Sequence, residues 1–196
     1  MATDVDLLKQ ELVALSHDFY RRGWSLATSG NFSARVDQDH FIITASGKDK
    51  GSLTLDDFVL VNLHQPPPDN ASTETLLHAT LYNLMQQTAC VLHTHSVSAT
   101  FLSLRQPEVI LEGYEMLKAL AGVSTHNHLE VLPVLPNSQD LSALAEEVLP
   151  MMKYQPNVHS FLIAGHGLYT WGETIFKARM QLEALEFMLE CEAKKS

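Results

Sequence analysis

The chain has 196 residues, of which 45% are hydrophobic and 18% charged, and its formal net charge is −10. This length and hydrophobicity predict one soluble domain, residues 1–196, with its own core. The acidic balance argues against nucleic acid or an anionic membrane as a partner, and no apolar run is long enough to predict a transmembrane helix. The charge does not exclude a phosphorylated substrate, because a few local donors can bind phosphate on an acidic protein.

Cysteine usage and the first residues predict a reducing compartment. Cys90 and Cys191 are far apart and form no CxxC motif, so no disulfide framework is expected. Residues 1–12 are acidic and amphipathic, unlike a signal peptide. We therefore expect a cytoplasmic protein.

The first half of the chain carries two helical patterns that flank three strand-like segments. Gly23 is the expected stop of the first helix, and Ser72 or Thr73 is the expected cap of the second. The expected elements are a helix at 4–22, strands at 31–36, 41–46 and 58–63, and a helix from about 73 to 84.

The second half mixes short strands with helices. Prolines within 129–136 suggest an edge strand, and Ser138 is the expected cap of the helix that follows. The expected elements are a strand at 89–95, helices at 97–104 and 113–120, a strand at 129–136, a helix at 138–152, two extended pieces within 160–172 and a helix at 173–193. Because strict βαβ repeats are missing, this order predicts an α/β sandwich with a mixed sheet.

The segment "VLHTHS" places His93 and His95 at the end of an apolar strand. Residues two apart on a strand point to the same face, so both imidazoles can reach one metal ion, while Thr94 points to the other face. The alternative is two polar residues at an exposed strand end.

A third imidazole, His166, lies between two glycines in "IAGHGLYTWG", after another apolar strand. Flanking glycines let the backbone bend and pass close to bulky groups. Three histidines on two strands suit Zn²⁺ with an open coordination position, which is a catalytic arrangement. The pattern also suits other divalent ions.

The remaining histidines form weaker patterns. His126 and His128 repeat the H-x-H spacing but follow a loop-like stretch, which favours loop histidines or the edge of a substrate pocket. For the others, surface or hydrogen-bonded core roles are expected: His17, His40, His64, His78 and His159.

Three segments could bind an anion. "TSGNFSAR" places Gly30 and Asn31 before a strand, and "TASGKDKG" places Ser46, Gly47 and Lys48 in a turn, where backbone N–H groups, hydroxyls and a lysine can meet a phosphate. The third is the helix start at Ser72 and Thr73. An ordinary turn or a helix cap is the alternative for each.

A proton acceptor is needed if the metal polarises a carbonyl group. Glu74, Glu112 and Glu115 could each serve, and a solvated glutamate is the alternative for all three.

Taken together and in this order, "TSGNFSAR", "ITASGKDKG", "STETLLH", "VLHTHS" and "AGHGLYTWG" resemble the class II aldolase/adducin family, over about residues 24–172. The resemblance implies an α/β/α sandwich with a central mixed, largely antiparallel sheet, and a homotetramer with active sites near subunit contacts. It also implies one Zn²⁺ per subunit on His93, His95 and His166.

The same resemblance implies the roles of further residues. The phosphate site maps to Asn31, Ser46, Gly47 and Ser72 or Thr73. Glu74 stands where the aldolases use a glutamate as metal ligand or acid/base, whereas some related dehydratases carry cysteine there. The stretch "LEGYEMLKAL" is similar to a dehydratase branch that acts on 5-methylthioribulose 1-phosphate in methionine salvage, and in that branch Glu115 is the acid/base.

The implied activity is therefore a metal-dependent dehydration of a small sugar phosphate. One alternative is a class II aldolase or epimerase that acts on a ketose phosphate. The other is a non-enzymatic module like the adducin head, which predicts lost metal ligands; this chain retains His93, His95 and His166.

Overall fold

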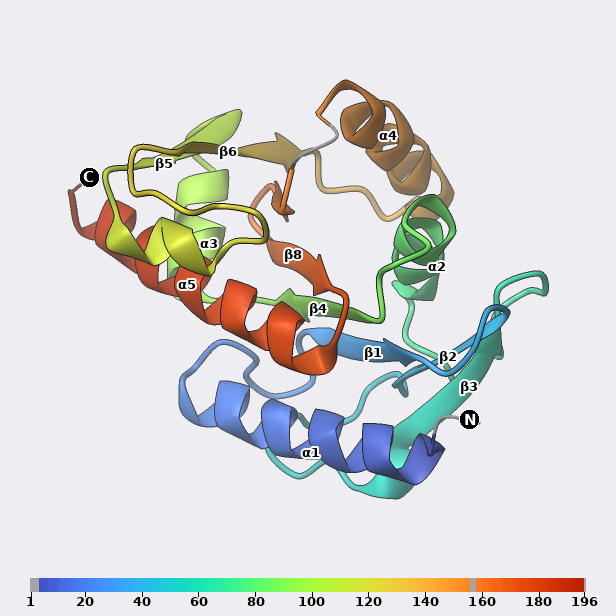
Figure 1. The fold of residues 1–196 in the computed structure, drawn as a ribbon. Helices are drawn as coiled ribbons and strands as arrows, with labels where there is room; N and C mark the ends of the chain where they lie inside the picture. The colour runs from blue at the N-terminus through green and yellow to red at the C-terminus, as the bar shows by residue number, and fades with distance from the viewer. Residues whose placement is uncertain (1–3, 156–157, 196) are drawn as a thin grey trace.

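The computed structural model describes residues 4–155 and 158–195. Within these residues, eight strands form a single sheet, and five α-helices and two 3₁₀ helices (η) lie around it (Figure 1). The elements are α1 (Val5–Arg21), β1 (Asn31–Arg35), β2 (His40–Thr44), η1 (Leu55–Asp57), β3 (Phe58–Asn62), α2 (Thr75–Leu84), β4 (Cys90–Thr94), α3 (Val97–Ser103), β5 (Glu108–Glu112), η2 (Glu115–Ala119), β6 (Leu129–Leu135), α4 (Leu141–Tyr154), β7 (Ser160–Ile163), β8 (Gly167–Gly172) and α5 (Ile175–Lys195).

The sheet is mixed and largely antiparallel, as predicted. Its strand order is β3-β2-β1-β4-β8-β7-β6-β5, and β6–β7 is its parallel pair. Strands β4 and β8 lie side by side at the centre, with His93 opposite Tyr169. The segments that carry His93 and His166 therefore meet in the middle of the sheet.

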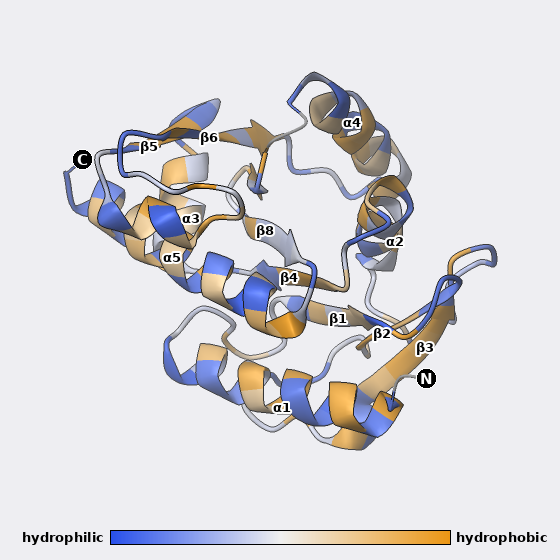
Figure 2. Ribbon diagram, viewed as in Figure 1, coloured by the Kyte–Doolittle hydropathy of each residue, from blue (hydrophilic) through white to orange (hydrophobic). Residues whose placement is uncertain are grey.

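Helices cover both faces of the sheet, which confirms the α/β/α sandwich. One core holds Phe19 of α1 and Leu185 of α5 against Leu92 of β4. The other core lies on the opposite face and holds Leu81 of α2 and Val148 of α4. Figure 2 shows hydrophobic and hydrophilic residues on each of these helices, as expected for elements that bury one side only.

The prediction of an edge strand at 129–136 is wrong. Strand β6 lies between β7 and β5, and the edge is β5, a strand that the sequence analysis did not predict. The prolines are tolerated because β7 pairs with β6 only at Val134 and Leu135, after Pro133. Up to Pro133, β5 is the partner of β6, so a missing N–H on the other side breaks no ladder.

Two helix starts also differ from the prediction. Helix α2 is preceded by Glu74, whose backbone N–H donates to Ser72 Oγ at 3.3 Å. Helix α4 is capped by Asp140, whose carboxylate accepts from Ser142 N at 3.0 Å and Ala143 N at 3.1 Å. The helix that was expected at residues 113–120 is shorter in the structure and is the 3₁₀ helix η2. Within the described ranges, no helix has the length and hydropathy needed to cross a bilayer.

Gly167 has a packing reason at the start of β8. A Cβ atom built there would lie 1.9 Å from the carbonyl oxygen of Thr94 on β4. Only glycine lets β8 approach β4 this closely, and this approach brings His166 beside the end of β4.

Candidate metal centre

Strand β4 delivers two imidazoles to one face of the sheet. His93 stacks on Tyr169 of β8, with ring centroids 4.0 Å apart. Thr94 points to the other face, as predicted, and its Oγ1 donates to Glu186 of α5 at 2.6 Å. Alternation along the strand thus separates His93 and His95 from Thr94.

Four side chains converge at this end of β4. The Nε2 atom of His93 lies 2.8 Å from His95 Nε2 and 3.3 Å from His166 Nε2. Glu74 joins them: Oε2 lies 3.3 Å from His93 Nε2, and Oε1 lies 3.4 Å from His166 Nε2. One ligand atom from each of the four residues lies within 4.8 Å of the others, a spacing that can hold one metal ion.

Proton placement at His93 supports a cation at this point. Its Nδ1 lies 3.0 Å from the carbonyl oxygen of Leu168, an acceptor, so Nδ1 carries the proton and Nε2 presents a lone pair. Burial lowers the pKa of His93 well below its usual value, and burial followed by the charges of His93 and His166 lowers that of His95 to about 3. Neutral imidazoles are the form that binds metal.

The carboxylate of Glu74 gives a second reason. Its Oε1 atom is buried and accepts no hydrogen bond from the described residues. A buried carboxylate oxygen without a donor is costly unless a cation neutralises it. The donor set of three imidazoles and one carboxylate therefore fits a divalent metal ion such as Zn²⁺.

A cavity of about 660 Å³ opens beside the candidate metal ligands. Its wall includes Gly30, Thr44 and Asn137, together with five of the predicted phosphate residues: Asn31, Ser46, Gly47, Ser72 and Thr73. Gly47 has φ of +70°, a left-handed conformation that suits glycine and shapes the turn after β2. Hydroxyls and a turn that line one cavity form a candidate anion site.

The lysine of this cavity is Lys50, which the sequence analysis did not single out. The Lys48 side chain is half exposed and pairs with Asp57 at 2.8 Å, and Lys48 is not part of the cavity wall. Lys50 lines the cavity, and its Nζ donates to the carbonyl oxygens of Thr28 at 3.0 Å and Lys48 at 2.8 Å. Burial lowers the pKa of Lys50 to about 8. The sequence K-D-K shows that two lysines lie in this turn, but only the geometry of the turn decides which of them faces the cavity.

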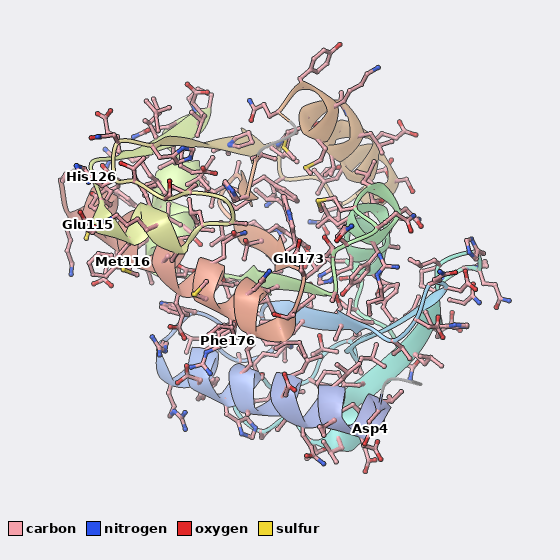
Figure 3. All side chains as sticks on the ribbon, in the orientation of Figure 1. Asp4, Glu115, Met116, His126, Glu173 and Phe176 are labelled. Atoms are coloured by element: carbon pink, nitrogen blue, oxygen red, sulfur yellow. The ribbon has the colours of Figure 1, made fainter. Side chains whose placement is uncertain are left out.

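Glu115 does not join this cluster within one protomer. It lies on η2 with 70% of its side chain exposed, beside Lys118 and 3.3 Å from His126 Nδ1. Figure 3 shows Glu115 and His126 together at one edge of the molecule. Glu112 is also exposed, on β5.

A second histidine–carboxylate cluster joins β6 and β7. Glu130 Oε2 lies 2.8 Å from His128 Nε2 and 2.9 Å from His159 Nδ1. The second ring nitrogen of His159 lies 2.8 Å from the Ala121 carbonyl oxygen, so both nitrogens face acceptors. Burial lowers the pKa of His159, but the hydrogen bond and charge of Glu130 outweigh it and raise that pKa overall. A protonated His159 satisfies this cluster, whose pairing the sequence spacing did not reveal.

Known proteins are similar to this chain in sequence and in fold. A family model described as class II aldolase and adducin N-terminal domain matches residues 10–193. The methylthioribulose-1-phosphate dehydratase of Yersinia enterocolitica is 47% identical over 189 residues, covering 94% of this chain and 90% of that protein. The protein of the same name from Sorangium cellulosum is 48% identical over 188 residues, covering 92% and 89%.

Solved structures agree with the fold. The L-fuculose-1-phosphate aldolase from Thermus thermophilus superposes with a TM-score of 0.79 at 26% identity, covering 96% of this chain and 93% of that one. A sugar-phosphate aldolase from Thermotoga maritima, at 17% identity and a TM-score of 0.68, covers 95% and 92% and shares the fold. With its sequence matched over residues 10–193, the chain belongs to the class II aldolase/adducin family.

Proposed function

We propose that this protein is a hydro-lyase that converts 5-methylthioribulose 1-phosphate to 5-methylthio-2,3-dioxopentyl phosphate, the dehydration step of methionine salvage, in the cytoplasm. The observation that carries the proposal is the convergence of Glu74, His93, His95 and His166. They lie beside a cavity whose wall has many hydrogen-bond donors that could bind an anion. The choice of substrate rests on the two relatives that are named for this activity, at 47% and 48% identity.

The cavity residues would bind the phosphate end of the substrate. Ser46, Gly47, Ser72 and Thr73 would donate hydrogen bonds to the phosphate, and Lys50 would add a positive charge. Binding the phosphate orients the neighbouring carbonyl and hydroxyl carbons toward the histidines. Asn31 lines the same cavity, and its side chain is hydrogen-bonded to Glu74 and contacts His78.

One Zn²⁺ per subunit would be held by His93, His95 and His166, with Glu74 as a fourth ligand or as a second acid. When bound there, the ion polarises the C2 carbonyl group and makes the C3 proton more acidic. Imidazole and carboxylate ligands also suit other divalent ions, so metal analysis is needed to assign the ion.

Glu115 would be the acid/base. Its carboxylate takes the proton from C3, the C4–O bond breaks, and the departing hydroxide receives that proton and leaves as water. The enol that remains tautomerises to the 2,3-diketone. Removal of the proton and departure of the hydroxyl thus use one carboxyl group.

The exposed position of Glu115 indicates how it would reach the substrate. It lies outside the cavity wall of its own protomer, with 70% of its side chain exposed. We infer a homotetramer in which Glu115 of the partner subunit enters the cavity. Mixing a Glu115→Gln variant with a His95→Ala variant tests this: an exchanged tetramer regains activity if the groups meet across a contact, and stays inactive if both act within one subunit.

Turnover of synthetic 5-methylthioribulose 1-phosphate, with and without a chelator, tests the activity itself. The expected product is the diketone, followed by its ultraviolet absorbance, and the chelator should abolish its formation. An aldolase on the same site would break the C3–C4 bond, and dihydroxyacetone phosphate in a coupled assay would then replace the diketone. A stable preparation that contains no metal and cannot be reconstituted would favour a non-enzymatic module.

A further inference from the structure

A chain of buried polar side chains leads from the interface of α2 and the sheet to the metal centre. The hydroxyl of Tyr82 lies 2.8 Å from Ser33 Oγ, and Ser33 Oγ lies 2.7 Å from His78 Nδ1. His78 Nε2 contacts Asn31 Oδ1, and Asn31 Nδ2 lies 2.5 Å from Glu74 Oε2. Tyr82, Ser33 and His78 are fully buried, and Asn31 and Glu74 are at most 7% exposed.

The contacts along this chain fix the direction of every hydrogen bond. The Glu74 carboxylate can only accept, so the amide nitrogen of Asn31 faces it and the amide oxygen faces His78. His78 Nε2 must then donate, which leaves Nδ1 of the neutral ring to accept from the hydroxyl of Ser33. Ser33 has used its proton, so Tyr82 donates to Ser33. All four hydrogen bonds therefore point toward Glu74.

This alignment has a consequence for the ligand oxygens of Glu74. Asn31 holds Oε2, whereas Oε1 accepts no hydrogen bond from the described residues and lies 3.4 Å from His166 Nε2. The amide thus sets the rotation of the carboxylate, and His78 sets the orientation of the amide. We propose that His78 is a positioning residue that acts through Asn31 to hold Glu74 as a metal ligand.

The polar chain is better explained by this role than by core packing. Tyr82 packs against Phe41 with ring centroids 4.9 Å apart, and His78 packs against Tyr169 at 5.7 Å. Apolar residues could fill such sites, and a buried polar network gives no more stability than a well-packed apolar core. Partners of metal ligands, in contrast, typically change metal affinity 10- to 100-fold when they are mutated.

The inference rests on the metal centre used in the proposed function, and metal affinity tests it without turnover. The zinc dissociation constant of the full chain is measured by competition with a chelator, for the wild type and for His78→Leu and His78→Gln. His78→Leu should weaken zinc binding about 10- to 100-fold. His78→Gln retains an N–H donor for Asn31 and should recover most of that loss.

Coupling to Glu74 separates positioning from a general effect on folding. In a Glu74→Gln background, His78→Leu should cause little further loss of zinc affinity, because the group that it positions has already lost its charge. The control is His17→Leu: this histidine is bonded to the Leu53 carbonyl oxygen at 3.1 Å, is no part of the cluster, and should leave zinc affinity unchanged. If His78→Leu proves insoluble, Tyr82→Phe and Ser33→Ala test the same chain, with Ser33→Ala having the larger effect.

Equal losses of zinc affinity in the two Glu74 backgrounds would overturn the inference, as would a variant that lowers the unfolding temperature but keeps its zinc affinity. Failure of the proposed function looks different. A protein that shows the coupling but does not dehydrate the proposed substrate leaves the positioning role intact. A protein that turns over substrate without the coupling keeps the function and loses the inference.

Discussion

Two histidine–carboxylate clusters in this protein have similar distances and opposite chemistry. In the metal centre, His95 Nε2 lies 2.8 Å from His93 Nε2; in the β6–β7 cluster, His128 Nε2 lies 2.8 Å from Glu130 Oε2. The first contact brings two ring nitrogens together, and the lone pair on His93 Nε2 is of the kind that binds a metal ion. The second places a ring nitrogen on an acceptor. Hydrogen-bond complementarity, more than spacing, separates a metal site from an ion pair.

Removing a ligand should give the largest difference between the clusters. His95→Ala should lose the metal and reduce turnover at least about 1000-fold, because polarisation by the metal contributes several kcal/mol to the reaction. His128→Ala should retain metal and most activity. Metal content per protomer and kcat are the measurements; metal lost from both variants would show that the clusters are not distinct.

Breaking the second cluster should affect stability instead of metal content. Glu130→Ala leaves the partly buried His159 cation without its buried partner and should lower the free energy of unfolding by about 3 kcal/mol. Chemical denaturation measures this, and metal analysis is the control. An unchanged stability would mean that His159 is neutral in the wild type.

The pH dependence of this effect follows from two pKa shifts. Hydrogen bonds from His159 and His128 outweigh burial and lower the pKa of Glu130 below 4.5, while the pKa of His159 is raised above 6.5. The pair therefore stabilises the fold fully between these values. Its contribution is lost as the pH falls through the folded pKa of Glu130 or rises through that of His159, so the stability gap between the wild type and Glu130→Ala should be widest near pH 5.5.

Glu186 extends the comparison because it is a buried carboxyl group that forms no ion pair with any described residue. Burial raises its pKa to about 7, although contacts with Ser96 and Thr94 oppose the shift. A raised carboxyl pKa means that the folded state binds more protons, so stability falls as the pH rises from about 4.5 to about 7. Glu186→Gln should therefore stabilise the metal-free protein by up to about 3 kcal/mol at pH 8 and have little effect at pH 4. An equal effect at both pH values would contradict this.

The smallest expected effect concerns the cavity beside the metal centre, which no residue of the β6–β7 cluster lines. Lys50→Met should raise KM for the sugar phosphate about tenfold and weaken inhibition by inorganic phosphate, because one charge-assisted contact is lost. The matched variant Lys48→Met removes an exposed ion pair with Asp57 and should change KM less than about twofold. The reverse order would restore Lys48 as the phosphate lysine.

Local patterns predicted much of the fold and three of the four residues of the candidate metal centre. Period-two alternation placed His93 and His95 on one face and Thr94 on the other, because side-chain direction on a strand depends on local geometry. The helix at 4–22 was predicted from apolar spacing, and a long closing helix was also predicted at 173–193. Strand β5 was missed, since it lies at the edge of the sheet with alternate residues exposed, and its pairing partner β6 is needed to recognise it.

The sequence by itself determined the family, the sandwich architecture, the candidate metal-ligand types and the candidate anion-binding turns, because these depend on residue identity and short-range periodicity. Tertiary structure alone decided that Lys50 and not Lys48 lines the cavity, that His159 pairs with Glu130, and that His78 reaches Glu74 through Asn31. These contacts join residues up to 47 positions apart. Their protonation and orientation depend on burial and on which groups the packed sheet brings face to face, and no spacing within the chain encodes that.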